Sequence, residues 1–137
     1  MGVLIDASVL IQAERGKLDI ASRVQGREEE EFFISVITAS ELLHGVWRVP
    51  QRETKVRAKR VAFVEGVLSR FPLLPVDLPT ARIHAQLWAH LEAKGISVGP
   101  HDGWLAASCI AHGLSLATGN VREFKRIPGL AVEDWLS

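Results

Sequence analysis

The sequence has 137 residues, of which 47% are hydrophobic and 23% charged, and its 16 basic residues balance its 16 acidic ones. This length predicts one domain with a sizeable core, and the composition excludes a disordered or fibrous chain. A net charge of zero excludes long-range attraction to nucleic acid or membranes, so any site for a polyanion must be a local patch. No apolar run reaches the roughly 18 residues that span a bilayer and no leader-like pattern is present, so we expect a cytoplasmic protein.

Short strand-like runs alternate with segments whose apolar residues have helical spacing, which predicts an α/β domain with a largely parallel sheet. The strand-like runs are residues 3–5, 32–36, 73–76, 115–117 and 130–132. The strongest helical pattern begins near Pro79 and stops at Gly95. A longer helix is expected from about residue 51 to residue 69, between two prolines. The pattern thus predicts a sheet of five strands.

Three acidic residues each stand in or just before the first turn of a helical run, and for two of them, Asp6 and Glu41, that run follows a strand-like one. Asp6 lies within VLIDASVLI, Glu41 lies three positions after Thr38, and Asp102 opens the helical pattern that follows residues 99–100. One interpretation is that all three acids stabilise the first turns of helices. Aspartate is a good N-cap, Thr38 with Glu41 has the spacing of a capping box, and acids near a helix N-terminus gain about 0.3–1 kcal/mol. For each acid taken alone, this interpretation remains open.

The three acids together favour a second interpretation. In a parallel sheet, the strand-to-helix junctions lie along one edge, so Asp6, Glu41 and Asp102 are expected to converge. Carboxylates so close together would repel, and would either raise one another's pKa or recruit a cation. Mg²⁺ and Mn²⁺ prefer oxygen ligands and commonly join carboxylates to the phosphates of a substrate. The convergence therefore suggests phosphodiester hydrolysis.

Four motifs in this chain, taken in order, resemble those of the PIN-domain ribonucleases, and among them the VapC-type toxins of toxin–antitoxin pairs. The motifs are LIDASVLI, ISVITASELLHGV, VGPHDGWLAASCIAHGLSLATGN and VREFKRIPGLAVEDW. The resemblance implies a single PIN domain over residues 1–137, with a three-layer α/β/α fold and a mostly parallel five-stranded sheet. It also implies an endoribonuclease that depends on Mg²⁺ or Mn²⁺ and leaves a 5′-phosphate and a 3′-hydroxyl.

The resemblance also assigns roles to individual residues. Asp6, Glu41 and Asp102 fall on the catalytic acid positions. Asp6 and Asp102 are expected to ligate the metal, and Glu41 either completes its shell or orients the attacking water. Ser8 and Thr118 fall on hydroxyl positions that support the acids or the metal-bound water.

The match is imperfect at Asn120. The family often has a fourth acid at this position, whereas Asn120 is a neutral oxygen donor that lowers the negative charge of the site. A first metal ion is therefore better supported than a second. Arg122 follows Asn120 closely and is the candidate substrate-binding cation, while the basic residues from 48 to 60 are either a solvated helix face or an RNA-binding patch.

The resemblance implies a small VapB-type antitoxin as partner. Its C-terminal segment is expected to cover the acidic pocket, held by a clip that the second and third helices form. The chain itself is expected to form a homodimer or a toxin–antitoxin hetero-oligomer, with RNA as substrate and no membrane contact.

Three other classes of protein remain for comparison. A haloacid-dehalogenase-type phosphatase needs a second Asp two residues after the first, where this chain has Ser8, and a receiver domain needs an acid pair that is also missing. The alternative left open is a catalytically silent PIN-like module that binds RNA or protein. In that interpretation the three acids cap helices, and Asn120 marks the loss of metal chemistry.

Overall fold

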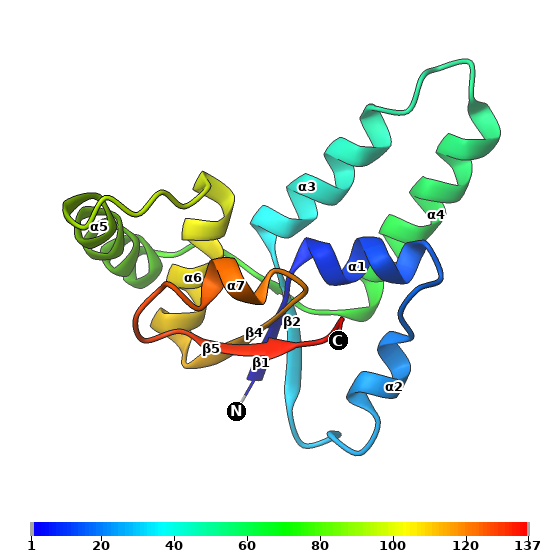
Figure 1. Ribbon diagram of the computed structural model, residues 1–137. Coiled ribbons are helices and arrows are strands. Elements are labelled where there is room, and N and C mark those ends of the chain that lie inside the picture. The colour runs from blue at the N-terminus through cyan, green and yellow to red at the C-terminus, as the bar shows by residue number, and fades with distance from the viewer. Residues whose placement is uncertain (1, 137) are drawn as a thin grey trace.

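The computed structural model describes residues 2–136 and contains a five-stranded parallel sheet with helices on both faces (Figure 1). The strands are β1 (Gly2–Ile5), β2 (Glu31–Ser35), β3 (Leu73–Leu74), β4 (Leu114–Thr118) and β5 (Ala131–Asp134). Their order across the sheet is β3-β2-β1-β4-β5, and all four neighbouring pairs are parallel. The predicted α/β/α fold is confirmed. Met1 and Ser137, the ends of the predicted domain span 1–137, lie outside the described residues.

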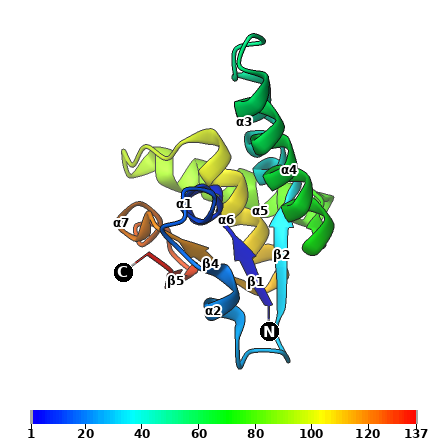
Figure 2. The same ribbon diagram turned by 90° about the vertical axis from the view of Figure 1, so that its right-hand side faces the viewer.

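Seven helices surround this sheet within residues 2–136. They are α1 (Ala7–Glu14), α2 (Ile20–Val24), α3 (Val36–Trp47), α4 (Thr54–Arg70), α5 (Leu78–Ala93), α6 (Pro100–His112) and α7 (Val121–Phe124). Helices α3 and α4 run side by side and extend away from the sheet as an antiparallel pair, which both views show (Figures 1 and 2). Within the described chain, none of the seven helices is long and apolar enough to cross a membrane.

The central strand β1 is buried on both faces, which explains its uninterrupted apolar sequence. Val3 and Ile5 point to a core formed with α1, α3 and α4, while Leu4 points to a second core formed with α5, α6 and α7. This alternation follows from the two-residue period of a strand. The carboxyl end of β1 is therefore fixed from both sides, and the residue that follows it is held in place.

Two predicted boundaries were wrong for local reasons. The run at 73–76 forms only a two-residue strand, because Pro75 lacks the N–H that would continue the ladder. The helix expected to begin at Thr38 with a Thr38–Glu41 capping box begins instead at Val36. Ser35 is its N-cap, since the Ser35 hydroxyl accepts a 3.0 Å hydrogen bond from the backbone N–H of the residue two positions on. Thr38 and Glu41 therefore lie inside the helix and do not form a capping box.

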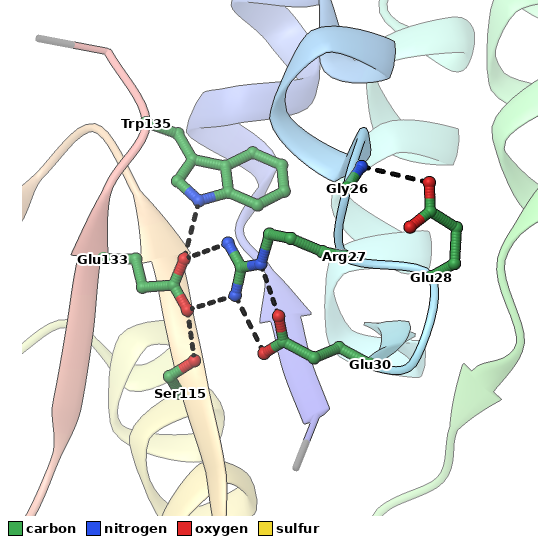
Figure 3. Close-up of polar contacts among 7 residues, drawn as sticks. All are labelled: Gly26, Arg27, Glu28, Glu30, Ser115, Glu133 and Trp135. Carbon is green, nitrogen blue, oxygen red and sulfur yellow. Dashed lines mark hydrogen bonds and ion pairs between the residues drawn. The ribbon is translucent and has the colours of Figure 1, made fainter.

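An ion-pair cluster ties the loop after α2 to strand β5 (Figure 3). The Arg27 guanidinium donates to both oxygens of Glu133, at 2.7 and 3.0 Å, and also pairs with Glu30. Trp135 Nε1 and Ser115 Oγ donate to the same Glu133 carboxylate, at 3.1 and 2.8 Å. Bidentate, charge-assisted contacts of this kind are strong and geometrically specific. The cluster fastens the edge strand β5 to the loop that leads into β2.

We predict that Glu133→Gln removes part of the pH dependence of stability. Hydrogen bonds from Arg27, followed by those from Trp135 and Ser115, lower the pKa of Glu133 from 4.5 to about 2. A carboxylate with a lowered folded-state pKa stabilises the fold above about pH 4.5, and this contribution disappears as the pH falls towards about 2. Discounted for partial exposure, it is about 1–2 kcal/mol.

Urea denaturation of the wild type and of Glu133→Gln at pH 6 and pH 3 measures this contribution. The free energy of unfolding should fall less for the variant than for the wild type between the two pH values. Glu29→Gln, a change to an exposed glutamate in the loop before β2, is the matched control and should follow the wild type. Equal losses for wild type and Glu133→Gln would contradict the prediction.

Candidate active site

Asp6 follows β1 directly, and its carboxylate is buried and held by two hydroxyls. Its backbone N–H donates to the carbonyl of Ala117 at 2.9 Å, which continues the pairing between β1 and β4. Ser8 Oγ and Thr118 Oγ1 both donate to Asp6 Oδ2, at 2.8 and 2.7 Å. The carboxylate makes no capping hydrogen bond to α1, although Asp6 occupies the N-cap position. Side-chain capping therefore does not account for the aspartate at this position.

Backbone N–H groups in the turn from β4 into α7 hold the hydroxyls of Ser8 and Thr118. The backbone N–H of Gly119 donates to Ser8 Oγ at 3.1 Å, and that of Asn120 donates to Thr118 Oγ1 at 2.9 Å. Each hydroxyl thus accepts a backbone hydrogen bond and donates one to Asp6. Donors and acceptors arranged in such chains polarise and orient one another. The orientation of the Asp6 carboxylate is therefore fixed by segments more than 100 residues away in the sequence.

Glu41 extends from α3 towards the start of α6. Its Oε2 atom lies 3.5 Å from Nδ1 of His101, and its Oε1 atom is buried without a hydrogen-bond partner among the described residues. Burial raises the pKa of Glu41, as do the negative charges of Asp6 and Asp102, while His101 acts in the opposite direction. The charge of Glu41 is therefore only partly compensated.

Asp102 lies in the first turn of α6, just after Pro100. The N-cap of this helix is Gly99, and no side chain caps it. Burial raises the pKa of the half-buried Asp102 carboxyl, and the negative charges of Asp6 and Glu123 raise it further. Asp6, Glu41 and Asp102 thus share one electrostatic neighbourhood. Asp6 precedes α1, Glu41 lies in the middle of α3, and Asp102 lies in the first turn of α6. The three helices gather beyond the carboxyl ends of the strands (Figure 1).

The chemistry of these donors fits a hard divalent cation. The converging side chains offer carboxylate oxygens, which Mg²⁺ and Mn²⁺ prefer. The mutual repulsion of Glu41 and Asp102 with Asp6 is a feature that a cation would relieve. As the side chains stand in residues 2–136, no three His, Cys, Asp or Glu are placed to hold a metal together. An ion here would take fewer side chains and complete its shell with water or substrate oxygens.

The residues that follow Thr118 differ in how they relate to the acids. Asn120 is exposed, and its side chain does not cap α7. Arg122 is exposed on α7. Glu123 pairs with Arg126 at 2.6 Å, yet its charge still raises the pKa of Asp102. The fourth negative charge near the site therefore comes from Glu123, three residues beyond the position where a fourth acid was sought.

A family model described as PIN domain matches residues 3–130. The chain belongs to the PIN-domain family. This PIN domain is 43% identical over 132 residues to Ribonuclease VapC1 of Rickettsia felis, which covers 96% of this chain and 95% of that protein. It is 39% identical over 102 residues to the tRNA(fMet)-specific endonuclease VapC of Salmonella typhimurium, which covers 74% of each chain. The resemblance inferred from the four motifs is confirmed.

Solved structures of VapBC complexes contain chains with the same fold. The VapBC complex of Salmonella typhimurium bound to DNA contains a chain that is 33% identical, with a TM-score of 0.88 over 98% of both chains. The VapBC2 complex of Rickettsia felis, bound to a DNA fragment from its promoter, contains a chain that is 26% identical, with a TM-score of 0.87 over 98% of this chain and 99% of that chain. These matches confirm the predicted fold over nearly the whole PIN domain.

A groove of about 860 Å³ lies beside Glu41 of this PIN domain. It is lined by α1, α3, α4 and the segment between α3 and α4, and Glu41 and His101 are among its lining residues. Apolar side chains such as Ile11 and Phe63 line it together with charged ones such as Arg60. The groove thus joins the space between the α3–α4 pair to the acidic site.

Proposed function

We propose that this PIN domain is a metal-dependent endoribonuclease that acts as the toxin of a toxin–antitoxin pair, with residues 1–137 working as one domain. The observation that supports the proposal most strongly is that Asp6 is held by Ser8 and Thr118 without capping a helix, in the same electrostatic neighbourhood as Glu41 and Asp102. The ribonuclease and endonuclease names of the relatives agree with this chemistry.

Each acid has its own part in the proposed reaction. Asp6 and Asp102 would hold Mg²⁺ or Mn²⁺, which when bound lowers the pKa of water and neutralises charge on the reacting phosphate. Glu41 would orient the attacking water. Ser8 and Thr118 keep the Asp6 carboxylate in one orientation. Asn120 supports this arrangement through its backbone N–H.

RNA is the proposed substrate, and tRNA(fMet) is the first RNA to test because relatives carry that specificity in their names. Arg122 is proposed to contact a phosphate of the substrate, since it is exposed on the helix that begins directly beside the site. Its charge is not required for the acidic network, which is built from other side chains.

Arg122→Ala should therefore raise KM about 3- to 10-fold and leave kcat nearly unchanged, because it removes binding that substrate and transition state share. The salt dependence of binding should become shallower by about 0.7 in log–log slope, as expected for one lost phosphate contact on a single strand. Arg70→Ala, a change to an exposed arginine at the end of α4, is the matched control and should behave as wild type. A loss of kcat without a change in KM would contradict this role.

A small VapB-type antitoxin is the proposed partner, and the groove between α1, α3 and α4 is its proposed seat. Related chains are found in VapBC complexes. The groove reaches Glu41 and His101, so an occupant would also cover Glu41. Exposed apolar side chains at Trp47 and Val56 extend the apolar surface along α3 and α4. The proposal also includes a homodimer of this chain, either alone or within the hetero-oligomer.

Cleavage of tRNA(fMet) and of total RNA by the purified chain tests the proposed activity. With Mg²⁺ we expect fragments with 5′-phosphate and 3′-hydroxyl ends, identified by end-specific sequencing. EDTA and the variant Asp102→Asn should each abolish cleavage, and persistence in either would contradict the mechanism. If the wild type binds RNA but never cleaves it, the alternative of a silent binding module would replace the proposal.

A further inference from the structure

Three buried side-chain atoms lack a hydrogen-bond partner among the described residues, and two of them lie within one turn of α3. They are Thr38 Oγ1 and Glu41 Oε1, and the third is Arg57 Nε on α4. Thr38 is completely buried. Residues three apart on a helix lie on the same side, so the Thr38 hydroxyl and the Glu41 carboxylate share one face of α3. Both unmet groups therefore belong to one small region.

Unmet polar atoms at such a position call for a physical explanation. A buried donor or acceptor without a partner costs about 1–3 kcal/mol. A threonine inside a helix usually bonds to the carbonyl four residues earlier, and the Thr38 hydroxyl does not. Buried polar groups in this situation are commonly satisfied by an ordered water that bridges them. A valine would fill the same volume with no unmet atom, so the hydroxyl of Thr38 does not serve packing.

We propose that Thr38 is a positioning residue of the active site, which holds the Glu41 carboxylate through an ordered water. The water donates a hydrogen bond to Glu41 Oε1 and accepts one from the Thr38 hydroxyl. His101 contacts the other oxygen, Oε2, at 3.5 Å. The carboxylate is then oriented from both of its oxygens, towards the neighbouring Asp6 and Asp102. This inference rests on the proposed ribonuclease function and adds a residue to that site.

The substitution Thr38→Val, which keeps the shape and removes the hydroxyl, tests this role. We expect kcat for RNA cleavage to fall about 10- to 100-fold, because misplacing a catalytic group by about 1 Å costs that order of rate. KM should stay within about 2-fold, and the unfolding midpoint should change little, since valine keeps the shape of the buried side chain and Glu41 keeps its contact with His101. Thr38→Ser keeps the hydroxyl and should retain most of the wild-type kcat.

High-resolution crystal structures supply a readout that does not depend on activity. The wild type and Thr38→Ser should show an ordered water within hydrogen-bond distance of position 38 and of Glu41 Oε1, and Thr38→Val should lack it. Thr38→Ala serves if the valine variant does not fold. Unchanged kcat in the variant, or no such water in the wild type, would overturn the inference. If the wild type cleaves no RNA at all, the proposed function fails, and the water alone decides whether Thr38 orients Glu41.

Discussion

Asp6→Asn should lower the rate of RNA cleavage by about 10²- to 10³-fold while leaving the protein at least as stable as the wild type. The loss of rate is expected because an amide cannot supply the negative charge that holds a divalent cation. Stability should be kept because an Asn oxygen can still accept from Ser8 and Thr118, and because the repulsion of Glu41 and Asp102 is relieved. Initial cleavage rates and thermal unfolding at the same pH measure the two effects.

The control for this prediction is an aspartate that does cap a helix. Asp19 accepts a hydrogen bond from the backbone N–H of Ala21 at the start of α2. Asp19→Ala should therefore cost some stability and leave cleavage unchanged, which is the reverse of the result at Asp6. If Asp6→Asn destabilises the protein and cleaves at the wild-type rate, Asp6 is a structural residue and the silent-module alternative gains support.

Thr118→Val should lower both stability and activity, because the Thr118 hydroxyl makes one hydrogen bond as a donor and one as an acceptor. Thr118 Oγ1 donates to Asp6 and accepts from the backbone N–H of Asn120, and the side chain is fully buried. A valine side chain has the same shape but makes neither hydrogen bond, so the free energy of unfolding should fall by about 1.5–3 kcal/mol. A loosened Asp6 should reduce kcat about 10- to 100-fold.

Urea denaturation and steady-state kinetics on Thr118→Val measure these two losses. Thr118→Ser is the matched control, since a serine hydroxyl can make both contacts, and it should stay near the wild type in both measurements. The contrast with Thr38→Val is also informative, because that change is expected to reduce kcat without a loss of stability. A Thr118→Val protein with wild-type kcat would show that the network around Asp6 has no part in catalysis.

Patterns that depend on neighbours in sequence could be predicted well. Strand β1 is recognisable because both of its faces are buried, and α5 because Pro79 and Gly95 mark its ends. The proximity of Asp6 and Glu41 could also be anticipated, because each follows a parallel strand at the same edge of the sheet, whereas Asp102 follows α5 with no strand before α6. The order of apolar, polar, proline and glycine residues along the chain was enough to predict these features.

Features that depend on distant side chains could not be predicted. The Thr38–Glu41 spacing has the form of a capping box, but Ser35 competes for the helix start, and only the backbone decides between them. The pairing of Arg27 with Glu133 joins residues 106 positions apart, and no local pattern signals it.

Calorimetric titration of Mn²⁺ into the purified chain tests the central claim most directly, because it measures the proposed metal site without any RNA. Asp6→Asn is the test variant, and Glu133→Gln, whose carboxylate is engaged by Arg27, is the control for loss of an acid elsewhere. We predict that wild type and Glu133→Gln bind Mn²⁺ with the same affinity and that Asp6→Asn binds at least about 10-fold more weakly. Equal binding by wild type and Asp6→Asn, or no binding by either, would contradict the account.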